Sequence, residues 1–414
     1  MSKLERYRVG IDIGTTKVCA LVGERGESGS VDIVGVGTSR SRGLRKGAIV
    51  NLEETVAAIK RAVEEAELMS GVSVDSAYIG IASTHVKGFN SRGSVTVGGK
   101  NREIVGEDIR RVLEGAKAVP LPFDREILHL LPQSFTVDNQ EGIEDPLGMC
   151  GSRLEVDVHV VTAASAAIQN LVTAVNRCGM AAAGTVLQPY AAGLACLTPD
   201  ERELGVLLLD IGGGSTDLVI FESRYLRQIA VVPIGGEHFT NDIAVGLRTP
   251  LAEAEAIKLK HGTVLEAALG EEDTLEVPGI GGRQPSLIAK KNLCEIIRPR
   301  AEEIFELARR EVRRSGYEGA LNSGAVLTGG GGVLDGLTEV AEQILQLPVR
   351  VGPPVAVGGL LDLVNNPAYA TAVGLVLYGF SSNRSKVLQR YMQESGGTLN
   401  RMRDLWRDLI GGGS

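Results

Sequence analysis

The chain has 414 residues, of which 43% are hydrophobic, enough to bury the cores of two or more domains. Its formal net charge of −8 at pH 7 provides no basic field for a nucleic-acid backbone, so nucleic acid is excluded as an expected partner. The five cysteines lack CxxC spacing, which argues against a disulfide framework or a thiolate metal site. With no signal peptide and no run of roughly 18 apolar residues, the sequence predicts a cytoplasmic protein.

The N-terminal part of the chain predicts three strands, a helix and a fourth strand. YRVGIDIGTTKVCALVGE (7–24) predicts two strands joined by a tight polar turn, and a third strand follows at 31–39. Apolar residues at helical spacing predict a helix over 52–69, and AYIGIAS (77–83) returns to a strand.

A second stretch of sequence repeats this plan. GVLLLDIGGGSTDLVIFES (205–223) is followed by strand, helix and strand patterns that end in AVLTGGGG (325–332). DIGTTK (12–17) and DIGGGSTD (210–217) fall at equivalent places in the two stretches. We therefore expect two duplicated α/β lobes that face each other across a cleft, with residues 84–159 inserted as a separate α+β subdomain.

The glycine-rich turns predict a phosphate site. Glycines let a turn bring its backbone N–H groups close to an anion, and Ser215 and Thr216 add hydroxyl donors. Asp12 and Asp210 end the strands before the two turns, where they would repel bare phosphate unless Mg²⁺ lay between them. The alternative is that each turn is only a tight β-turn.

Two further motifs allow more than one interpretation. VLTGGGGVLDGL (326–337) follows a strand and opens a predicted helix, a context that favours a nucleotide but is also found in ordinary turns. Glu255 and Lys258, three residues apart on one predicted helix, can form a solvated ion pair or bind a ribose and base.

Taken in order, DIGTTK, VLQPYAAGLACL (186–197), DIGGGSTD, AEAIK and LTGGGG resemble the nucleotide motifs of the actin/Hsp70/sugar-kinase superfamily. Within it, residues 128–163, TPLAEAEAIKLKHG and VPGIGGRQP resemble the FtsA family of actin-like bacterial cell-division proteins, over about residues 5 to 380. The resemblance implies RNase H-like lobes around a nucleotide cleft. It implies a first lobe at 1–83, 160–200 and 355–380, an inserted subdomain at 84–159, and a second lobe at 201–354 whose outer subdomain covers about 246–310.

The resemblance also implies that the cleft binds ATP and Mg²⁺. Asp12 and Asp210 would hold the metal, and Gln188 would join them as a catalytic residue by orienting the attacking water. The alternative for Gln188 is that it only begins a helix before Pro189. The expected nucleotide-binding residues are Gly14, Thr15, Thr16, Lys17, Gly212, Gly213, Gly214, Ser215, Thr216, Gly236, Glu255, Lys258, Gly329, Gly330 and Gly331.

The C-terminal segment predicts a membrane anchor. A polar, glycine-broken linker (381–397) precedes TLNRMRDLWRDLI (398–410), which is too short to span a bilayer but suits its interface. A single copy should bind weakly and a polymer by avidity. The alternative is a helix that docks on the chain's own core or on a partner helix. The apolar stripe consists of Leu399, Met402, Leu405, Trp406, Leu409 and Ile410.

The partners are implied by the resemblance alone. It implies binding of the acidic C-terminal peptide of the tubulin-like protein FtsZ, with Arg300, Arg298 and Lys291 as candidates, although such residues are usually just solvated. It also implies filaments of the chain itself and other division proteins at the inserted subdomain. The function implied is an ATP-binding protein, with slow or no hydrolysis, that polymerises on the cytoplasmic membrane face and anchors the FtsZ ring at the division site. The alternatives are a metabolite kinase or another actin-like scaffold.

Overall fold

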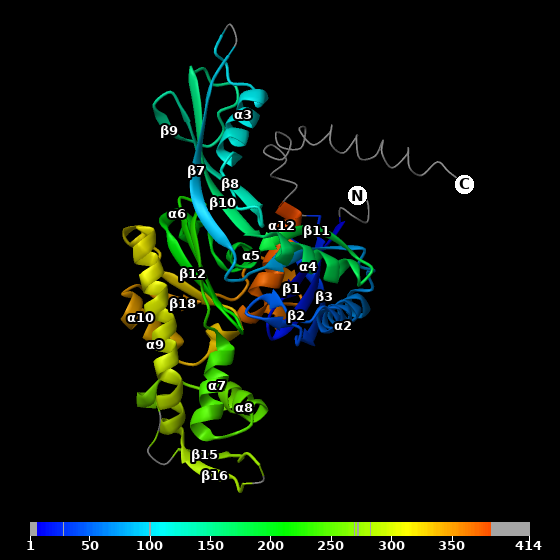
Figure 1. Cartoon of the computed structure of the whole chain (residues 1–414), viewed down its shortest axis with the longest axis vertical. Helices are drawn as coiled ribbons and strands as arrows, with labels where there is room; N and C mark the ends of the chain where they lie inside the picture. The colour runs from blue at the N-terminus through cyan, green and yellow to red at the C-terminus, as the bar shows by residue number, and fades with distance from the viewer. Residues whose placement is uncertain are drawn as a thin grey trace, which may run out of the picture. The chain divides into compact units, whose positions relative to one another are not determined.

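The computed structural model divides the chain into two compact units (Figure 1). Of the described residues, the larger unit comprises those up to Gly88, Pro122–His129 and Val161–Gly379, and the smaller one Phe89–Leu121, Leu130–Val160, Phe380 and Ser381. The residues that the structure describes are 6–27, 29–98, 101–268, 270, 273–281 and 283–381. The predicted linker, beyond Ser381, and the predicted amphipathic helix at 398–410 lie outside the described residues.

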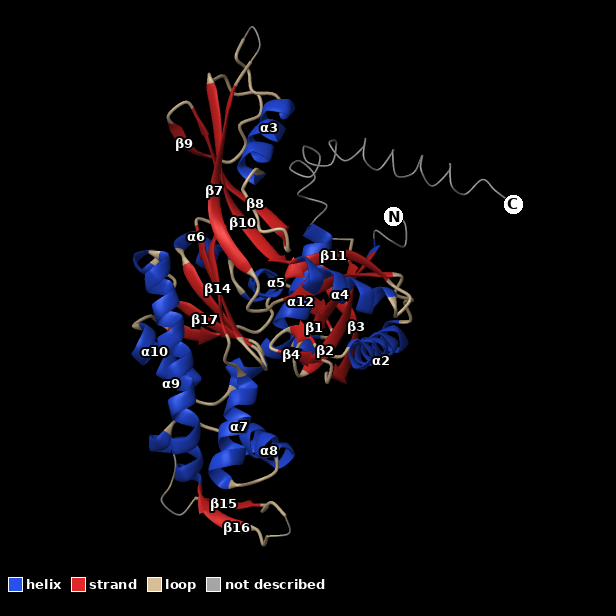
Figure 2. Ribbon diagram, in the orientation of Figure 1, coloured by secondary structure: helices blue, strands red, loops and turns tan. Residues whose placement is uncertain are grey.

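The first lobe of the larger unit contains a six-stranded sheet (Figure 2). β1, β2 and β3 form an antiparallel meander, and β6 and β11 continue the sheet in parallel beyond β1. The strands in spatial order are β11 (Ala181–Leu187), β6 (Ser76–Ile81), β1 (Tyr7–Ile13), β2 (Lys17–Arg25), β3 (Val31–Arg40) and β19 (Gly358–Gly359).

Helices cover both faces of this sheet, which explains why the middle of its central strand β2, Val18–Gly23, is apolar and buried. A Cβ on Gly10 would lie 2.8 Å from the Ala372 carbonyl oxygen of α12 (Ala370–Ser381). A Cβ on Gly37 would lie 1.9 Å from the Ala62 carbonyl oxygen of α2 (Leu52–Ser70). Through the register of β2, these two glycines face opposite sides of the sheet, so each helix packs directly on strand backbone.

The second lobe contains a five-stranded sheet with the same plan. Three strands again form an antiparallel meander and two more continue it in parallel. This match confirms the predicted duplication of α/β lobes. The strands in spatial order are β14 (Tyr225–Val232), β13 (Thr216–Glu222), β12 (Val206–Ile211), β17 (Ala325–Thr328) and β18 (Val349–Val351).

The helix predicted over 52–69 is present as α2, and three of the four apolar residues expected on its buried stripe are buried. Asn51 caps α2 by accepting from the Glu54 N–H, and Gly71 ends it in the left-handed region, at φ 68°. Val56, Ile59 and Val63 are buried as their spacing predicts. Leu68, expected on the same stripe, is 87% exposed because it lies in the last turn, off the buried face.

The remaining helices connect and flank the sheets. No helix in the part of the chain that the structure describes is long and apolar enough to cross a bilayer. The other α-helices of the larger unit are α4 (Ser165–Asn176), α5 (Gln188–Cys196), α6 (Pro199–Leu204), α7 (Gly236–Leu247), α8 (Leu251–His261), α9 (Lys290–Ser315), α10 (Leu337–Leu345) and α11 (Leu361–Val364). The 3₁₀ turns are η1 (Glu266–Ala268), η2 (Glu318–Ala320), η3 (Gly330–Val333) and η4 (Pro367–Tyr369).

The outer part of the second lobe consists of α7, α8, α9 and a small hairpin. The hairpin pairs β15 (Thr274–Val277) with β16 (Ser286–Ala289). Phe239 of α7 and Phe305 of α9 are at most 1% exposed and belong to the core that also packs against the five-stranded sheet. A shared core therefore holds this outer part to the lobe.

The smaller unit carries the α+β character predicted for the inserted segment. Its sheet has the order β7 (Lys87–Thr96), β10 (Arg153–Ala164), β8 (Arg125–Val137) and β9 (Gln140–Ile143), with helix α3 (Gly106–Lys117). The Val105 N–H donates to the Asp108 carboxylate at the start of α3, and Val112 and Leu113 are buried. In this unit, His159 lies 2.7 Å from the Asn90 side-chain oxygen.

Candidate nucleotide site

Two four-residue loops occupy equivalent places in the two sheets. The first loop, Gly14–Lys17, lies between the paired residues Ile13 and Val18 and includes Lys17, the first residue of β2. The second loop, Gly212–Ser215, joins β12 to β13. In each, the first N–H donates to the carbonyl of the fourth residue over 2.9 Å. The duplication therefore extends to the loop conformation.

The two loops meet each other directly. A Cβ built on Gly213 would lie 2.6 Å from Cγ2 of Thr16, and one on Gly214 would lie 2.9 Å from Oγ1 of Thr15. Real Cβ atoms do not approach so closely, so this junction requires glycine in the second loop. The first loop supplies the hydroxyl groups.

Both loops line one cavity of about 390 Å³. Asp12 and Asp210, as the sequence predicts, open onto this common space. All but one of the residues proposed for nucleotide, metal or catalysis line it; these are Asp12, Gly14, Thr15, Thr16, Lys17, Gln188, Asp210, Gly212, Gly213, Gly214, Ser215, Gly236, Glu255, Lys258, Gly329, Gly330 and Gly331.

Thr216 is the exception, and its expected role as a ligand is corrected. Its side chain is 0% exposed, and its hydroxyl donates to the Ile234 carbonyl over 2.8 Å. As the first residue of β13 it points into the lobe. The hydroxyl therefore stabilises the fold behind the second loop.

Asp12 lies half-buried at the end of β1. The Gln188 side-chain amide donates to its carboxylate over 2.8 Å, so the first residue of α5 reaches the first lobe's acid. Burial raises the pKa of Asp12 to about 7, an effect that Lys17 opposes and Asp210 reinforces. The carboxylate needs a cation to stay ionised at low cost.

Asp210, at the equivalent place in β12, is more deeply buried. Its carboxylate accepts a 3.0 Å hydrogen bond from the Thr371 hydroxyl, and a Cβ on Gly329 would lie 2.3 Å from it. Gly329 has a φ of 81°, which favours glycine independently. Burial raises the pKa of Asp210 to about 6, while the Thr371 hydrogen bond and Lys17 oppose the rise.

Asp217 is a third acid at the cavity that the sequence analysis did not select. It pairs with Asp210 across the β12–β13 ladder, is 6% exposed, and lines the cavity. Its Oδ1 atom has no hydrogen-bond partner among the residues that the structure describes. Burial, reinforced by Asp210 and Asp12, raises the pKa of Asp217 well above its ordinary value. Asp217 is the final acid of DIGGGSTD, but nothing in the motif indicates that this acid is buried at the cavity.

The basic group of the first loop is held by the protein. The Lys17 ammonium donates to the Ala368 carbonyl over 2.8 Å and lies 4.0 Å from the centre of the Tyr369 ring. Both contacts fix the amine beside the acids. Lys17 therefore supplies positive charge within the first loop, as the sequence predicts, and is already anchored.

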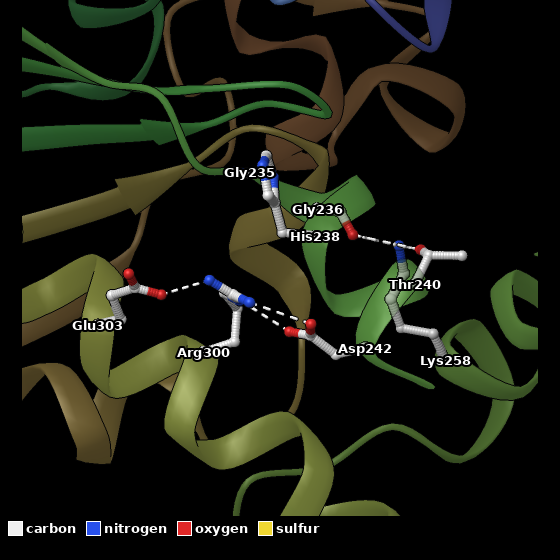
Figure 3. A network of polar contacts seen from close by, with 8 residues as sticks. All are labelled: Gly235, Gly236, His238, Thr240, Asp242, Lys258, Arg300 and Glu303. Atoms are coloured by element: carbon white, nitrogen blue, oxygen red, sulfur yellow. Dashed lines mark hydrogen bonds and ion pairs between the residues drawn. The ribbon is translucent and has the colours of Figure 1, made fainter. Parts of the chain in front are cut away.

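A second lysine, Lys258 of α8, also lines the cavity, and Figure 3 shows its contacts with Gly236 and Thr240. The Lys258 ammonium donates to the Gly236 carbonyl over 3.0 Å and to the Thr240 hydroxyl over 2.8 Å, and lies 2.7 Å from the Glu255 carboxylate. The ion pair foreseen for Glu255 and Lys258 thus exists and faces the cavity. Thr240, from α7, is a further member that sequence spacing did not reveal.

The glycine run at 326–337 differs from the predicted strand and helix in one respect. β17 ends at Thr328 and the glycines form the short 3₁₀ turn η3, and α10 begins only at Leu337. Val333, which is 46% exposed, and Leu259, which is 73% exposed, also line the cavity. These two apolar side chains give it a surface suited to an aromatic base.

The three basic residues proposed for an acidic peptide each have an ion-pair partner within the chain. Arg300 makes two hydrogen bonds, of 2.7 and 3.0 Å, with the Asp242 carboxylate and also pairs with Glu303 (Figure 3). The remaining pairs are Arg298 with Glu302 and Lys291 with Glu266.

The donor set of the cavity fits a hydrated magnesium ion. Mg²⁺ keeps several waters and is usually held by one or two carboxylates together with phosphate oxygens. Asp12 and Asp210 supply such carboxylates, and the unpartnered oxygen of Asp217 would gain from a nearby cation. Within the described ranges, no three His, Cys, Asp or Glu side chains form a direct metal-ligand cluster.

Comparison with known families gives two matches. The family model described as "Cell division protein FtsA" matches residues 207–374. The model described as "SHS2 domain inserted in FTSA" matches residues 83–162 and confirms an inserted domain in this part of the chain.

Curated relatives match over most of the chain. It is 48% identical to cell division protein FtsA of Pseudomonas aeruginosa, over 90% of this chain and 88% of the relative. It is 42% identical to the Neisseria meningitidis protein of the same name, over 91% of each chain. It is 38% identical to the Escherichia coli K12 protein of the same name, over 95% of this chain and 96% of the relative.

Solved structures support the actin-like fold. The PilM–PilN type IV pilus biogenesis complex matches with a TM-score of 0.65 and 20% identity, over 90% of this chain and 98% of that chain. MreB5 of Spiroplasma citri bound to ADP matches with a TM-score of 0.57 and 14% identity, over 93% of this chain and 99% of that chain.

Proposed function

Because the chain belongs to the FtsA family of cell-division proteins, we propose that it is an ATP-binding, actin-like protein that polymerises on the cytoplasmic membrane face. There it anchors the FtsZ ring at the division site and recruits other division proteins. The observation that carries the nucleotide part is the cavity onto which both loops and three buried or half-buried acids open. Two lobes that share one ligand can respond to it by closing.

The residues at this cavity have complementary tasks. Backbone N–H groups and hydroxyls of Gly14–Thr16 and Gly212–Ser215 bind phosphate oxygens, and Lys17 adds fixed positive charge. Asp12 and Asp210 hold Mg²⁺ largely through water. When bound, the metal supplies charge neutralisation between phosphate and carboxylate. Glu255 and Lys258 approach the nucleoside, whose base lies against Leu259 and Val333.

Gln188 is the proposed water-positioning residue. An amide cannot act as a strong base, but it can hold a water molecule beside a terminal phosphate. Its 2.8 Å hydrogen bond to Asp12 fixes the amide at the cavity wall, at the start of α5. In this proposal, Gln188 allows hydrolysis, and nucleotide state would act mainly on assembly.

The inserted segment 84–159 is proposed as the docking region for other division proteins. The outer subdomain of the second lobe, at 246–310, is proposed to bind the FtsZ tail. An acidic FtsZ peptide would have to compete with Asp242 for Arg300. In fluorescence anisotropy with a labelled tail peptide, Arg300→Ala should weaken binding several-fold. Unchanged binding would remove Arg300 from the site.

Vesicle co-sedimentation tests the membrane part. The full chain and a chain lacking 398–410 are spun with vesicles of mixed neutral and anionic lipid, with and without Mg²⁺–ATP. A Leu405→Asp, Trp406→Asp double variant keeps the chain length and serves as the matched control. Only the unaltered chain should pellet with lipid, more strongly with Mg²⁺–ATP because assembly adds avidity. Equal pelleting of all three would contradict the anchor.

A further inference from the structure

A short hairpin near the cavity contains an unusual turn. β4 (Leu44–Arg45) pairs with β5 (Ala48–Ile49) through Leu44 with Ile49 and Arg45 with Ala48, which leaves Lys46 and Gly47 as a two-residue turn. Their φ angles are 50° and 75°. Two successive positive φ values in a two-residue hairpin correspond to a type I′ turn.

Lysine is a poor residue for the first position of such a turn. The Cβ atom of an L-residue disfavours the left-handed region, and type I′ turns usually have Asn, Asp or Gly there. Residues kept in this region against their preference are often found at functional sites. The strain at Lys46 therefore raises the question of what the lysine side chain does.

The turn lies against the tips of both loops. The Gly47 N–H donates to Oγ1 of Thr15 over 3.3 Å, and a Cβ on Gly214 would lie 3.2 Å from Cα of Lys46. The Ser83 hydroxyl donates to the Lys46 carbonyl over 3.2 Å. Gly47 itself lines the cavity. The backbone at Lys46 thus contacts the second lobe's loop while its neighbour is bonded to the first lobe's loop.

The Lys46 ammonium is an uncommitted positive charge beside the loops. The side chain is exposed, and no hydrogen bond or ion pair of its ammonium is found among the described residues. Lys17 and Lys258, which line the cavity, are both bonded to protein oxygens. A lysine is a compact charge on a flexible four-carbon stem, suited to reaching a phosphate.

We propose that Lys46 binds the terminal phosphate of the nucleotide and, by doing so from a turn in contact with both loops, favours the closed cleft. The proposal rests on the nucleotide-binding function above and adds to it the residue that distinguishes a triphosphate from a diphosphate. The strained turn places the lysine at the loops, and the phosphate gives its charge a partner.

The test measures ATP and ADP affinities, each with Mg²⁺, by calorimetry on the full chain. Lys46→Gly is the main variant, because glycine keeps the left-handed turn without strain and removes only the side chain. It should weaken ATP about tenfold, as expected for a lost charge-assisted phosphate contact, and ADP by less than about twofold. Lys46→Arg should keep most of the ATP preference.

Arg45→Ala is the matched control, since Arg45 is an exposed cation on the same hairpin, and it should leave both affinities unchanged. An unchanged ATP-to-ADP ratio in Lys46→Gly would overturn the proposal, as would an equal loss in Arg45→Ala. If the unaltered chain bound neither nucleotide, the proposed function would fail instead. The two failures are thus distinguishable.

Discussion

The two loops are closed by the same backbone hydrogen bond but differ in the side chains that they and their strands carry. Each has four residues closed by the same 2.9 Å hydrogen bond and follows an aspartate at the end of its strand. Across the ladder, however, Asp12 pairs with the neutral Cys19, whereas Asp210 pairs with a second acid, Asp217. Lys17 has no basic counterpart in the second loop, whose residues are glycines and a serine.

This difference indicates a division of tasks between the lobes. The first loop offers hydroxyls and a fixed ammonium, which suit phosphate oxygens. The second offers backbone donors beside two buried acids, which suit a cation and the phosphate that the cation neutralises. Duplication provides the common frame, and the asymmetry lets one ligand require both halves.

The largest expected effect comes from removing Asp210 or Asp12, the equivalent acids of the two lobes. Asp210→Ala should reduce Mg²⁺–ATP affinity about 100-fold, and Asp12→Ala about tenfold or more, because Asp210 is the more buried of the two acids. Calorimetric titration with Mg²⁺–ATP measures both. Asp75→Ala, an exposed acid of the first lobe that lies away from this cavity, is the control. Binding that survived in Asp210→Ala would refute the metal assignment.

A steric change tests the contact between the loops. Gly213→Ala places a methyl group 2.6 Å from Cγ2 of Thr16 and should weaken nucleotide binding about tenfold by holding the loops apart. Adding Thr16→Ser removes that methyl contact and should restore part of the affinity. Gly319→Ala, in the second lobe but not in the lining of this cavity, is the control, since a Cβ there would meet no atom within 4 Å. A failure of the serine rescue would argue against direct contact.

The Asp217→Asn variant tests the second acid that distinguishes the second lobe from the first. Burial raises the pKa of Asp217 in the folded chain. As pH rises above the ordinary value near 4, the unfolded chain therefore loses this proton first, and the free energy of unfolding falls. The asparagine variant should therefore melt higher than the unaltered chain without Mg²⁺, increasingly so from pH 5 to 8. It should also need about fivefold more Mg²⁺ for nucleotide binding. Equal melting temperatures across this range would contradict the picture of an uncompensated acid.

The smallest effect on affinity concerns the support of Gln188, the residue that contacts the first lobe's acid. The Nε2 atom of His129 accepts from the Leu187 N–H over 3.0 Å, directly before Gln188, and His129 packs against Tyr190 and Tyr378. Burial lowers the pKa of His129 to about 4. The unfolded chain then binds the proton first, so stability is lost as pH falls from about 6.5 to 4.

His129→Gln should keep nucleotide affinity within about twofold at neutral pH and reduce this acid sensitivity, measured by urea unfolding at pH 7.5 and 5. The pKa of His159, in the smaller unit, is also lowered to about 4, so part of the acid sensitivity remains in the variant. An unchanged difference between the two pH values would show that His129 does not contribute.

Local patterns were sufficient to predict the loops, and the reason is physical. Glycine runs between apolar strands specify a tight turn that approaches a ligand, so Gly14 and Gly212–Gly214 could be identified from spacing alone. Thr216 belongs to the same motif, but strand alternation turns it inward, to the Ile234 carbonyl.

Tertiary contacts were not predictable in this way. Nothing in LRKGAI indicates that Lys46 lies against Gly214, and no local pattern joins Arg300 to Asp242, 58 positions away. Asp217 was missed for a different reason, because a lone acid in a strand has no periodic signal of burial. Such residues become recognisable only when the sheets bring their neighbours together.

The central claim is that both loops bind one magnesium-bound nucleotide, and a crystal structure of the chain with Mg²⁺ and a non-hydrolysable ATP analogue tests it most directly. The account predicts terminal phosphates in contact with both Gly14–Lys17 and Gly212–Ser215, with a hydrated metal ion between Asp12 and Asp210. A nucleotide bound elsewhere, or phosphates that touch only one of the two loops, would contradict it.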